Sequence, residues 1–486
     1  MNVENMKFTP KAFLFSIREL GYTPQESIAD IIDNSIAQDA KNIIFRIYST
    51  SQSSAKYISI MDDGSGMTEN ELTNKAMSWG TDLKKMRNQN DLGKYGFGLK
   101  SASLAHCDIL TVITKKDGKI SHRRVDASHI FESDKLESLT EPATDMEEHI
   151  NRLNKQQSGT VVVWQKLSRL LDAETISVRN SHVPIIAIRE KTKKHIAMTY
   201  SEMMDKINIH INTVTDDTNI IEPWDPFLKN HPETIIFPET KIDYKGSMVI
   251  VKPYILPSKK ILQNESRTLF NEAAGSTGNW LDRQGFYIYR KNRLIVPGDW
   301  LEVGNSPMER RDKYNQLRIK IEYNGEYDDD WRINLMKTRI RVPVLVRNKL
   351  TAIVKDLINE LRKMNYKKTP ITNKEGERTP WTYLDNYGSK SLKIDRNNPI
   401  IANLLNSNQE TRKKFEEVLK LLEKKFPDQD ISFKDQKSFG NFNEKISEKK
   451  INLETSIKLA LEMHKEGYDN TEIIDKILNF NNMKEI

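Results

Sequence analysis

Asp30 and Asn34 stand four residues apart in the segment Thr23–Ala37, and Asp33 directly precedes Asn34. If the segment is helical, the Asp30 carboxylate and the Asn34 amide lie one turn apart on the same side. Oxygen atoms of these two kinds can bind a hard cation such as Mg²⁺. A solvated polar stripe on a helix would give the same pattern, so this segment alone leaves both interpretations open.

Two glycine-containing motifs follow in the chain. The first, Asp62–Met67 (DDGSGM), comes directly after a strand-like run, and the second, Gly93–Ser103, has the pattern G-x-x-G-x-G followed by a helical run. Backbone N–H groups and a helix start would together suit an anion in the second motif. The pattern is weak by itself, because a glycine-rich hairpin also fits it. A Rossmann fold does not fit, since no βαβ unit with a later ribose-binding acid is present.

The helix that must position Asp30 and Asn34 has a well-marked start. Thr23 can cap it, Pro24 suits the first helical position, and Glu26 has the spacing of a capping box. An apolar face at helical spacing consists of Ile28, Ile31, Ile32 and Ile36. The pattern predicts an amphipathic helix with its polar side chains on a different side from the isoleucines.

Strand-like runs surround this helix. They are predicted at Asn42–Tyr48, Lys56–Met61, Ile109–Thr114, Ile120–Val125 and Ser158–Trp164. A short helix is expected after Thr68, which has Glu71 at capping-box spacing, and Glu132–Gln157 is expected to be an acidic insert. Up to about residue 170, this order predicts an α/β sandwich with helices on one face of a mixed sheet.

A second set of strands is predicted further along the chain, at Met248–Ile255, Gly285–Arg290, Arg293–Val296 and Leu317–Tyr323. The basic segment Trp331–Pro343 and a helix at about Val344–Arg362 follow. Residues 363–397 are polar and are expected to be irregular. Beyond them, a charged helical stripe at 415–426 and a final helical pair, Leu453–Glu466 and Asn470–Phe480, are predicted.

The composition is typical of a soluble globular protein. Of 486 residues, 37% are hydrophobic and 29% charged, and no run approaches the roughly 20 apolar residues of a membrane span. The start of the sequence lacks a signal-peptide pattern, so we expect a cytoplasmic protein without a membrane partner. The single cysteine, Cys107, excludes an intrachain disulfide. A net charge of +7 and a pI near 9.0 mildly favour polyanionic partners.

Four stretches, in this order, resemble the GHKL ATPases, the family of gyrase B, Hsp90, MutL, MORC proteins and sensor histidine kinases. The stretches are Asp30–Asn34, Asp62–Gly66, Gly93–Gly98 and Gly159–Thr160. The variants GKYGFGLKS and IIDNS most resemble MORC ATPases and their prokaryotic relatives. The resemblance implies an α+β fold, in which a Bergerat-type α/β sandwich is followed by a transducer-like domain of the S5 type and a helical C-terminal region.

The expected domain boundaries follow from this resemblance and from the composition. Residues 1–180 would form the ATP-binding domain and residues 181–362 the transducer-like domain. Residues 363–410 would be a linker or arm, and residues 411–486 a charged helical region.

The resemblance also implies a role for each matched residue. Asn34 would bind Mg²⁺, Asp62 would accept a hydrogen bond from the adenine amino group, and Thr160 would contact the adenine end from the sheet. Gly66 would let the backbone close on the base. The glycines of the second motif would form a lid that wraps the phosphates. Further contacts to the nucleotide are expected from Gly64, Met67, Gly93, Lys94, Tyr95, Gly96, Phe97, Gly98, Leu99 and Lys100.

The expected general base departs from the family pattern. GHKL ATPases normally have Glu four residues before the Mg²⁺-binding Asn, whereas this chain has Asp30, whose side chain is one methylene shorter. Glu26 lies a full turn too early and already has a capping role. We therefore predict that Asp30 is the base and that turnover is slow.

The segment Trp331–Pro343 resembles the transducer loop, in which a lysine reaches the γ-phosphate. Lys337 is the best match to that lysine, and Arg339 is the second. A cation at this place would neutralise charge that develops on the phosphate. The alternative is an ordinary surface lysine before a helix.

Together these expectations describe a conformational clamp that binds ATP and Mg²⁺, forms a homodimer with ATP and hydrolyses it to ADP and phosphate. The resemblance implies action on double-stranded DNA, in a prokaryotic restriction or anti-phage defence setting, with separately encoded effector proteins as possible partners. The alternative function is an ATP-sensing switch or scaffold that recruits effectors and hydrolyses little ATP.

Overall fold

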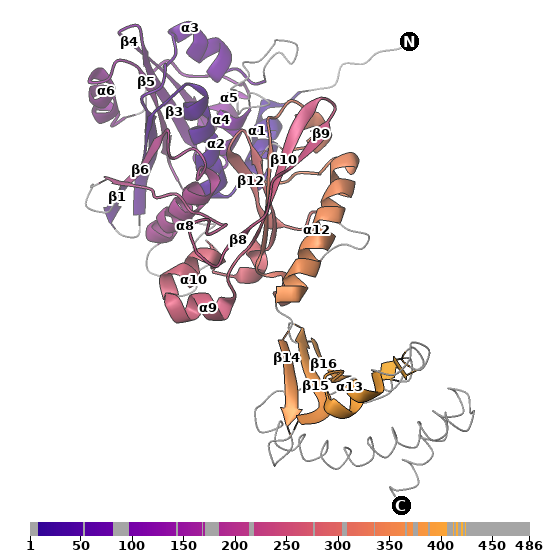
Figure 1. Cartoon of the computed structure of the whole chain (residues 1–486). Helices are drawn as coiled ribbons and strands as arrows, with labels where there is room; N and C mark the ends of the chain where they lie inside the picture. Colours follow the sequence, from indigo (N-terminus) through magenta and orange to yellow (C-terminus); the bar gives the residue numbers. More distant parts are fainter. Residues whose placement is uncertain are drawn as a thin grey trace, which may run out of the picture. The chain divides into compact units, whose positions relative to one another are not determined.

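The computed structural model describes residues 8–51, 54–80, 97–141, 144–167, 169–170, 184–212, 218–275, 278–303, 309–334, 336–364, 367–372, 378–386 and 389–405, and positions 412, 415, 416, 419, 420 and 423. The chain divides into two compact units, Met1–Val354 and Lys355–Ile486 (Figure 1). Each unit is considered by itself. No helix among the described residues is both long enough and apolar enough to cross a membrane.

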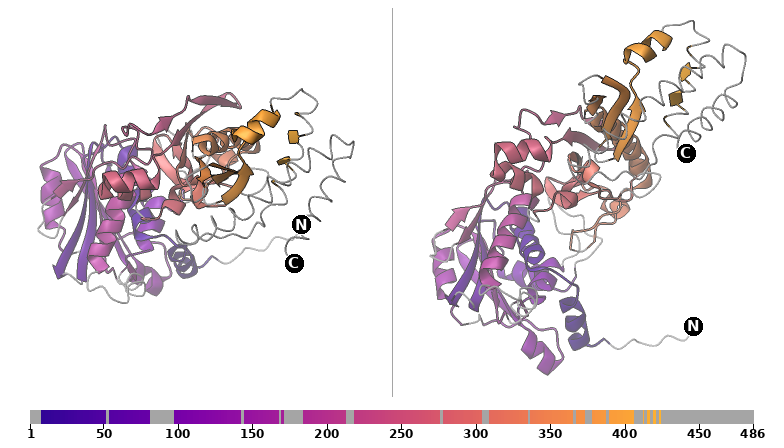
Figure 2. Two further views of the ribbon diagram at one scale, coloured as in Figure 1. Left: turned by 60° about the horizontal axis from the view of Figure 1, so that its bottom comes forward. Right: turned by 90° about the horizontal axis from the view of Figure 1, so that it is seen from below.

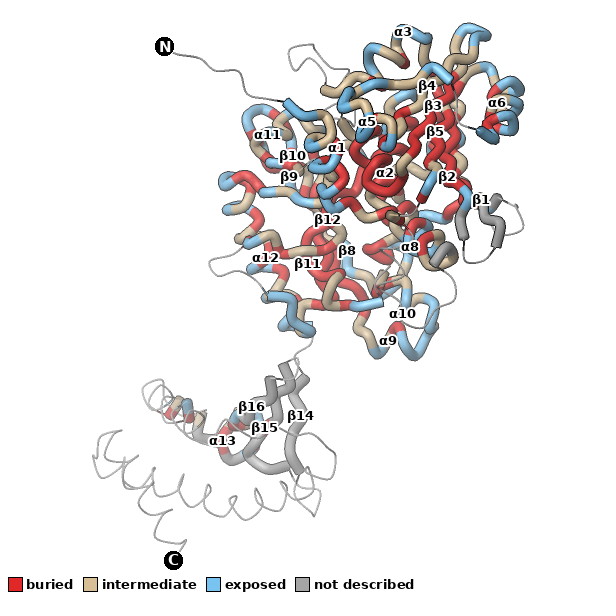
Figure 3. Tube along the Cα trace, turned by 180° about the vertical axis from the view of Figure 1, so that it is seen from behind, coloured by how far each residue is buried: buried red, intermediate tan, exposed pale blue. Residues whose placement is uncertain are grey.

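The predicted amphipathic helix is α2 (Pro24–Ala37), which follows α1 (Pro10–Arg18). Its capping box is present, because the Thr23 hydroxyl accepts from the Glu26 N–H at 3.4 Å and the Glu26 carboxylate accepts from the Thr23 N–H at 2.9 Å. Its isoleucines enter the core of the first unit, and Figure 3 shows α2 and the central strands as buried. The predicted start and apolar face of this helix are therefore confirmed.

Seven described strands form the first sheet, in the order β4-β3-β5-β2-β1-β6-β7. They are β1 (Asn42–Ser51), β2 (Ser54–Asp62), β3 (Ile109–Lys116), β4 (Lys119–Asp126), β5 (Gly159–Gln165), β6 (Asn208–Asn212) and β7 (Thr218–Ile220). All neighbours are antiparallel except β1 and β6, which are parallel, so the predicted mixed sheet is confirmed. The sheet extends beyond residue 180, where the sequence placed the domain boundary.

Both faces of the first sheet are covered, which corrects the expectation of helices on one face. One face packs against α2, α4 (Gly98–Leu104) and α8 (Pro184–Thr199). The other face packs against α6 (Glu147–Asn154), where Met146 and Leu153 join Val161 and Val163 of β5 in a second, smaller core. These two apolar side chains lie inside the acidic segment that was expected to be an insert, and they explain why part of it folds onto the sheet.

Several short elements complete this half of the unit. The capping box at Thr68 and Glu71 starts α3 (Glu69–Glu71), which continues as a π-helical turn, η1 (Leu72–Ala76). After β4, α5 (Ala127–Ser133) begins at Asp126, whose side chain caps it.

The second sheet has the order β12-β11-β13-β10-β8 among the described residues, and β9 pairs with β10. Its strands are β8 (Ile235–Ile236), β9 (Thr240–Tyr244), β10 (Ser247–Ile255), β11 (Gly285–Arg290), β12 (Arg293–Asp299) and β13 (Leu317–Tyr323). The helical elements here are α9 (Lys259–Glu265), α10 (Arg267–Ala274), η2 (Trp280–Arg283), η3 (Asp312–Tyr314), α11 (Asp328–Trp331) and α12 (Val344–Met364). The four strands predicted for this region are confirmed.

The helix α8 joins the two sheets of the first unit. Ile188, Ile196 and Tyr200, which lie on or just after this helix, belong to the core of the first sheet. Met198 packs instead with Tyr287 and other aromatic side chains of the second sheet. Figure 1 labels this helix between β6 of the first sheet and β8 of the second, and Figure 2 gives two further views of the same fold. The two sheets therefore share one structural support.

The second unit contains a three-stranded antiparallel sheet, β14 (Lys367–Thr372), β15 (Arg378–Asn386) and β16 (Ser389–Ile394), followed by α13 (Pro399–Leu405). The expectation of an irregular linker at 363–397 was therefore wrong. The strands are polar and lack the apolar alternation by which a strand is recognised in a sequence. The two predicted C-terminal helices lie outside the described residues.

Candidate functional site

Asp62 ends β2 and faces three hydrogen-bond donors from three different segments. The register of β2 and β5 places Asp62 opposite Thr160. The Asp62 carboxylate accepts from the Ser35 hydroxyl at 2.7 Å, the Gly64 N–H at 3.0 Å and the Thr160 N–H at 3.1 Å. Only 6% of Asp62 is exposed. The structure thus brings together Asp62, Gly64 and Thr160 and adds Ser35, which the sequence did not single out.

Burial changes the acidity of this carboxyl group. It raises the pKa of Asp62 to about 6, although the bonds from Ser35, Gly64 and Thr160 act in the opposite direction. At neutral pH the group is therefore ionised and held in one orientation, and its oxygens can accept few further hydrogen bonds. Such a group suits a directed hydrogen bond to a planar amine.

Gly66 is fixed by a close approach of two backbones. Its φ is +63°, and a Cβ added to it would lie 2.0 Å from the Lys115 carbonyl oxygen. The next residue, Met67, donates its N–H to the Thr114 hydroxyl at 2.8 Å, and that hydroxyl lies 3.1 Å from the Thr160 hydroxyl. The turn Gly64–Met67 is therefore tied to β3 and β5 directly beside Asp62.

Asp30 is almost completely buried on α2, with 2% of its surface exposed. Its Oδ2 accepts from the Tyr22 hydroxyl at 3.0 Å, and its Oδ1 accepts from the Lys337 ammonium group at 3.0 Å. Asn34, one turn later, is exposed. The polar side of the helix is therefore not uniformly solvated, because its first carboxylate is held by two specific partners.

Lys337 comes from a loop that the second sheet delivers to α2. The loop is closed by Asn334, whose side-chain oxygen accepts from the N–H groups of Thr338 and Arg339, both at 2.8 Å. Lys337 itself has a φ of +52°. The preceding Met336 packs against Tyr22, Ala102 and Ala105, which belong to the part of the unit that contains the first sheet. The structure thus places Lys337 against the helix that carries Asp30 and Asn34, while its contact with a γ-phosphate stays a prediction.

Asp33 is a further buried carboxylate in the same cluster. It accepts from Lys337 Nζ at 2.6 Å, from Arg293 Nε at 2.7 Å and from the Tyr200 hydroxyl at 2.8 Å. Burial alone would raise the pKa of Asp33, but Arg293 and Lys337 outweigh it and lower the pKa to about 2. The carboxylate therefore stays ionised, and it connects α2, which packs on the first sheet, to β12 of the second sheet.

The second glycine motif is described only in part. Gly93, Lys94, Tyr95 and Gly96 lie outside the described residues. Gly98 begins α4 close to Asp30, since a Cβ on Gly98 would lie 3.7 Å from Asp30 Oδ2. Burial lowers the pKa of Lys100 to about 8, and its ammonium group donates to the Ala76 carbonyl oxygen at 2.6 Å and lies 5.5 Å from the centre of the Trp79 ring. Phe97 and Leu99 flank Gly98 at the start of the helix.

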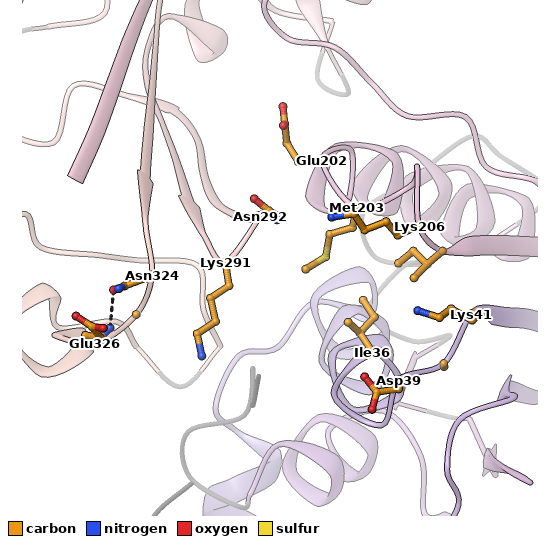
Figure 4. Close-up of a pocket in the computed structure, with 13 residues that line it drawn as sticks. Ile36, Asp39, Lys41, Glu202, Met203, Lys206, Lys291, Asn292, Asn324 and Glu326 are labelled. Carbon is orange, nitrogen blue, oxygen red and sulfur yellow. Dashed lines mark hydrogen bonds between the residues drawn. The ribbon is translucent and has the colours of Figure 1, made fainter. Parts of the chain in front are cut away.

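A cavity of about 610 Å³ lies at the same junction (Figure 4). Its labelled side chains come from the end of α2 and the turn after it, from the turn after α8, from the β11–β12 turn and from the turn after β13. They carry both charges, as Asp39, Lys41, Lys206 and Lys291 show. Among the described residues, none of the candidate nucleotide contacts lines it. The cavity is thus separate from the candidate site.

Five residues of the site were missed by the sequence reasoning, namely Tyr22, Ser35, Thr114, Tyr200 and Arg293. Tyr22 lies next to the cap residue Thr23, which is a weak local signal. Arg293 was predicted only as the first residue of a strand after a turn, and just 3% of it is exposed. No local pattern distinguishes a buried arginine from an exposed one at a hairpin, so its pairing with Asp33 could not be foreseen.

Comparisons with known proteins agree with this fold. Residues 22–160 match the family described as "Histidine kinase-, DNA gyrase B-, and HSP90-like ATPase". This part of the chain is therefore an ATPase domain of the GHKL type. Over 336 residues, the chain is 26% identical to "ATPase morc-1" of Caenorhabditis elegans, a match that covers 64% of this chain and 37% of the worm protein. The chain is thus similar to a MORC ATPase over well under half of that relative's length.

The GHKL family implies Mg²⁺, and the residues present fit it. Mg²⁺ prefers oxygen ligands and is usually held by one or two protein groups together with substrate phosphates and water. Asn34 is exposed on α2 and offers an amide oxygen one turn from Asp30. Asn34 would therefore hold the ion, which would neutralise phosphate charge.

Proposed function

We propose that this chain binds ATP with Mg²⁺ and hydrolyses it slowly, as a conformational clamp whose two halves meet at the γ-phosphate. The observation that carries the proposal is the contact between Lys337 and Asp30, because it joins a loop of the second sheet to the helix that also bears Asn34. A cation delivered by a second domain can report the presence of the terminal phosphate as a mechanical change.

Each site residue has a role in this proposal. The ionised Asp62 accepts from the adenine amino group, Gly66 gives the base access to the backbone, and Thr160 contacts the adenine end. Asn34 is the Mg²⁺ ligand. The phosphate contacts come from the glycine-rich lid and its helix, namely Gly93, Lys94, Tyr95, Gly96, Phe97, Gly98, Leu99 and Lys100, while Gly64 and Met67 complete the adenine end.

Hydrolysis requires that a water molecule attack the γ-phosphorus while the bond to ADP breaks. Asp30 takes the proton from this water, and Lys337 neutralises the charge on the phosphate that leaves. Tyr22 orients the Asp30 carboxylate through Oδ2. The shorter side chain of Asp, compared with the Glu of the family, is the reason to expect slow turnover.

The test is phosphate release by wild type and by variants of Asp30. We expect Asp30→Ala to lower kcat by about a hundredfold or more while a non-hydrolysable ATP analogue still binds. Asp30→Glu should retain turnover, because it keeps the carboxylate. Glu26→Gln is the matched control on the same helix and should change kcat little. Equal, slow phosphate release by wild type and Asp30→Ala, with ATP bound to both, would contradict hydrolysis by this residue.

The second candidate function is an ATP-sensing switch or scaffold that recruits effector proteins with little hydrolysis. It is favoured by the engagement of both Asp30 oxygens, one by Tyr22 and one by Lys337. In both versions we propose an ATP-dependent homodimer in the cytoplasm. The similarity to a MORC ATPase and the pI near 9.0 support a proposed action on double-stranded DNA in prokaryotic defence.

A further inference from the structure

Lys337 contacts two carboxylates of α2 at the same time. Its ammonium group lies 3.0 Å from Asp30 Oδ1 and 2.6 Å from Asp33 Oδ2. Only 11% of the lysine side chain is exposed, and Asp33 is fully buried. Both bonds are charge-assisted and shielded from water, so they are stronger than a surface ion pair.

The contact with Lys337 leaves Asp30 poorly suited to take a proton. Of its two oxygens, Oδ2 accepts from Tyr22 and Oδ1 accepts from the lysine. The ammonium group therefore occupies a place on Oδ1 to which a water molecule would have to donate in order to lose a proton to Asp30. For Asp30 to act on water, Lys337 must leave it.

The cluster is built so that each carboxylate keeps a hydrogen-bond partner when Lys337 leaves. Asp33 keeps the Arg293 guanidinium group at 2.7 Å and the Tyr200 hydroxyl at 2.8 Å, and Asp30 keeps Tyr22. The loss of one partner from a buried pair is costly when the remaining charge has no other partner. Here each carboxylate retains at least one.

We propose that Lys337 masks Asp30 until a γ-phosphate takes the lysine away, and that Asp33 is the positioning residue that holds the lysine in the masked arrangement. This inference rests on the proposed function. The γ-phosphate thereby triggers two events through one displacement: it gains the cation and it frees the base. ADP lacks this phosphate and leaves the mask in place.

The mask has a thermodynamic signature that separates it from a purely structural role of Asp33. Lys337 must break its bonds to Asp30 and Asp33 before it can bind the γ-phosphate, so these bonds oppose the binding of ATP but not of ADP. Weakening the mask should therefore strengthen only the binding of nucleotides that carry a γ-phosphate. A general loss of structure would affect both nucleotides alike.

The experiment measures Kd by calorimetry for ADP and for a non-hydrolysable ATP analogue, both with Mg²⁺, in the full chain. We expect Asp33→Asn to bind the analogue about tenfold more tightly than wild type, with the Kd for ADP unchanged. Lys337→Met should abolish the difference between the two nucleotides. Asp30→Asn neutralises the other carboxylate that contacts the lysine, and it should change the two Kd values as Asp33→Asn does. If Asp33→Asn does not fold, Asp30→Asn is the variant that tests the mask.

The outcomes distinguish this inference from the function on which it rests. Tighter binding of the analogue alone supports the mask. If the folded variants shift ADP and the analogue equally, or shift neither, the mask is overturned and ATP binding stands. If wild type binds neither nucleotide, the proposed function fails and the mask fails with it. Thermal melting of each variant identifies those that do not fold.

Discussion

A single carboxylate, Asp62, illustrates how the fold prepares a side chain for recognition. Three donors orient it, and burial raises its pKa to about 6. Because the pKa is raised, the folded protein favours the neutral form. The contribution of Asp62 to stability is therefore present below its ordinary pKa and is lost as the pH rises through about 6.

Nucleotide binding should show the opposite pH dependence at this residue, because the adenine amino group donates to the ionised form. We expect the affinity for ADP to be about tenfold weaker at pH 5 than at pH 7.5, since most Asp62 is protonated at the lower pH. Calorimetry at the two pH values measures this change. The phosphates of ADP also titrate in this range, and Asp62→Asn is the control that reports their share. An equal pH dependence in wild type and Asp62→Asn would contradict the assignment.

Gly66 provides a second prediction at the residue scale. Gly66→Ala would place a methyl group 2.0 Å from the Lys115 carbonyl oxygen, at a φ of +63°. We expect a loss of about 1–3 kcal/mol in the free energy of unfolding and at least tenfold weaker ADP binding, because the turn beside Asp62 must move. Gly118→Ala is the matched control, since Gly118 has a φ of +75° with nothing within 4 Å. Equal losses in both variants would show that only backbone strain matters.

At the scale of elements, the Lys337 loop depends on Asn334. Its side chain binds the N–H groups of Thr338 and Arg339 and donates to the Thr338 hydroxyl at 3.1 Å. Asn334→Ala removes these bonds without changing the lysine. We expect kcat for ATP to fall about tenfold, because Lys337 is no longer held in reach of the phosphate, while ADP affinity stays the same.

Steady-state phosphate release and calorimetry with ADP test this loop prediction. Thr338→Ser is the conservative control, because it keeps a hydroxyl that can accept from Asn334. An unchanged kcat in Asn334→Ala would show that Lys337 reaches its place without this closure.

The elements that could be predicted from the sequence are those with local causes. The capping box of α2 depends on two residues three positions apart, and most strands of the two sheets are apolar runs or apolar alternations. The β11–β12 hairpin has Lys291 and Asn292 at its turn, both with positive φ, as a two-residue turn of this kind requires. In such places the chain specifies its own conformation over a few residues.

The elements that could not be predicted depend on partners distant in the sequence. The strand β6 joins the first sheet only because it pairs in parallel with β1, about 160 residues earlier. The segment of α6 reads as acidic, and only the packing of Met146 and Leu153 on the outer face of the sheet explains its helix. The Asp33–Arg293 pair joins residues 260 positions apart. Spacing in the sequence pointed to Asp30 and Asn34, and the family resemblance pointed to Lys337, but neither predicted the network that holds them.

At the scale of the first unit, two features connect the sheets. The helix α8 contributes to the cores of both, and the Asp33–Arg293 pair crosses between α2 and β12. Arg293 and Asp33 are almost completely shielded from water. An ion pair at such a place contributes little net stability, but its two members depend strongly on one another.

Removal of Arg293 should therefore be far more damaging than removal of an exposed arginine. We expect Arg293→Gln to lower the free energy of unfolding by about 1.5–3 kcal/mol, because it removes a charge-assisted bond from the buried Asp33 and leaves Lys337 as its only cation. Arg310→Gln is the matched control, since Arg310 is 41% exposed and its pairs with Asp282 and Asp299 should contribute about 0–1 kcal/mol. Urea unfolding monitored by tryptophan fluorescence compares the two variants, and the double variant Asp33→Asn/Arg293→Gln should recover part of the loss. If Arg293→Gln costs no more than Arg310→Gln, this pair does not connect the two sheets, and α8 and the Lys337 loop must hold them.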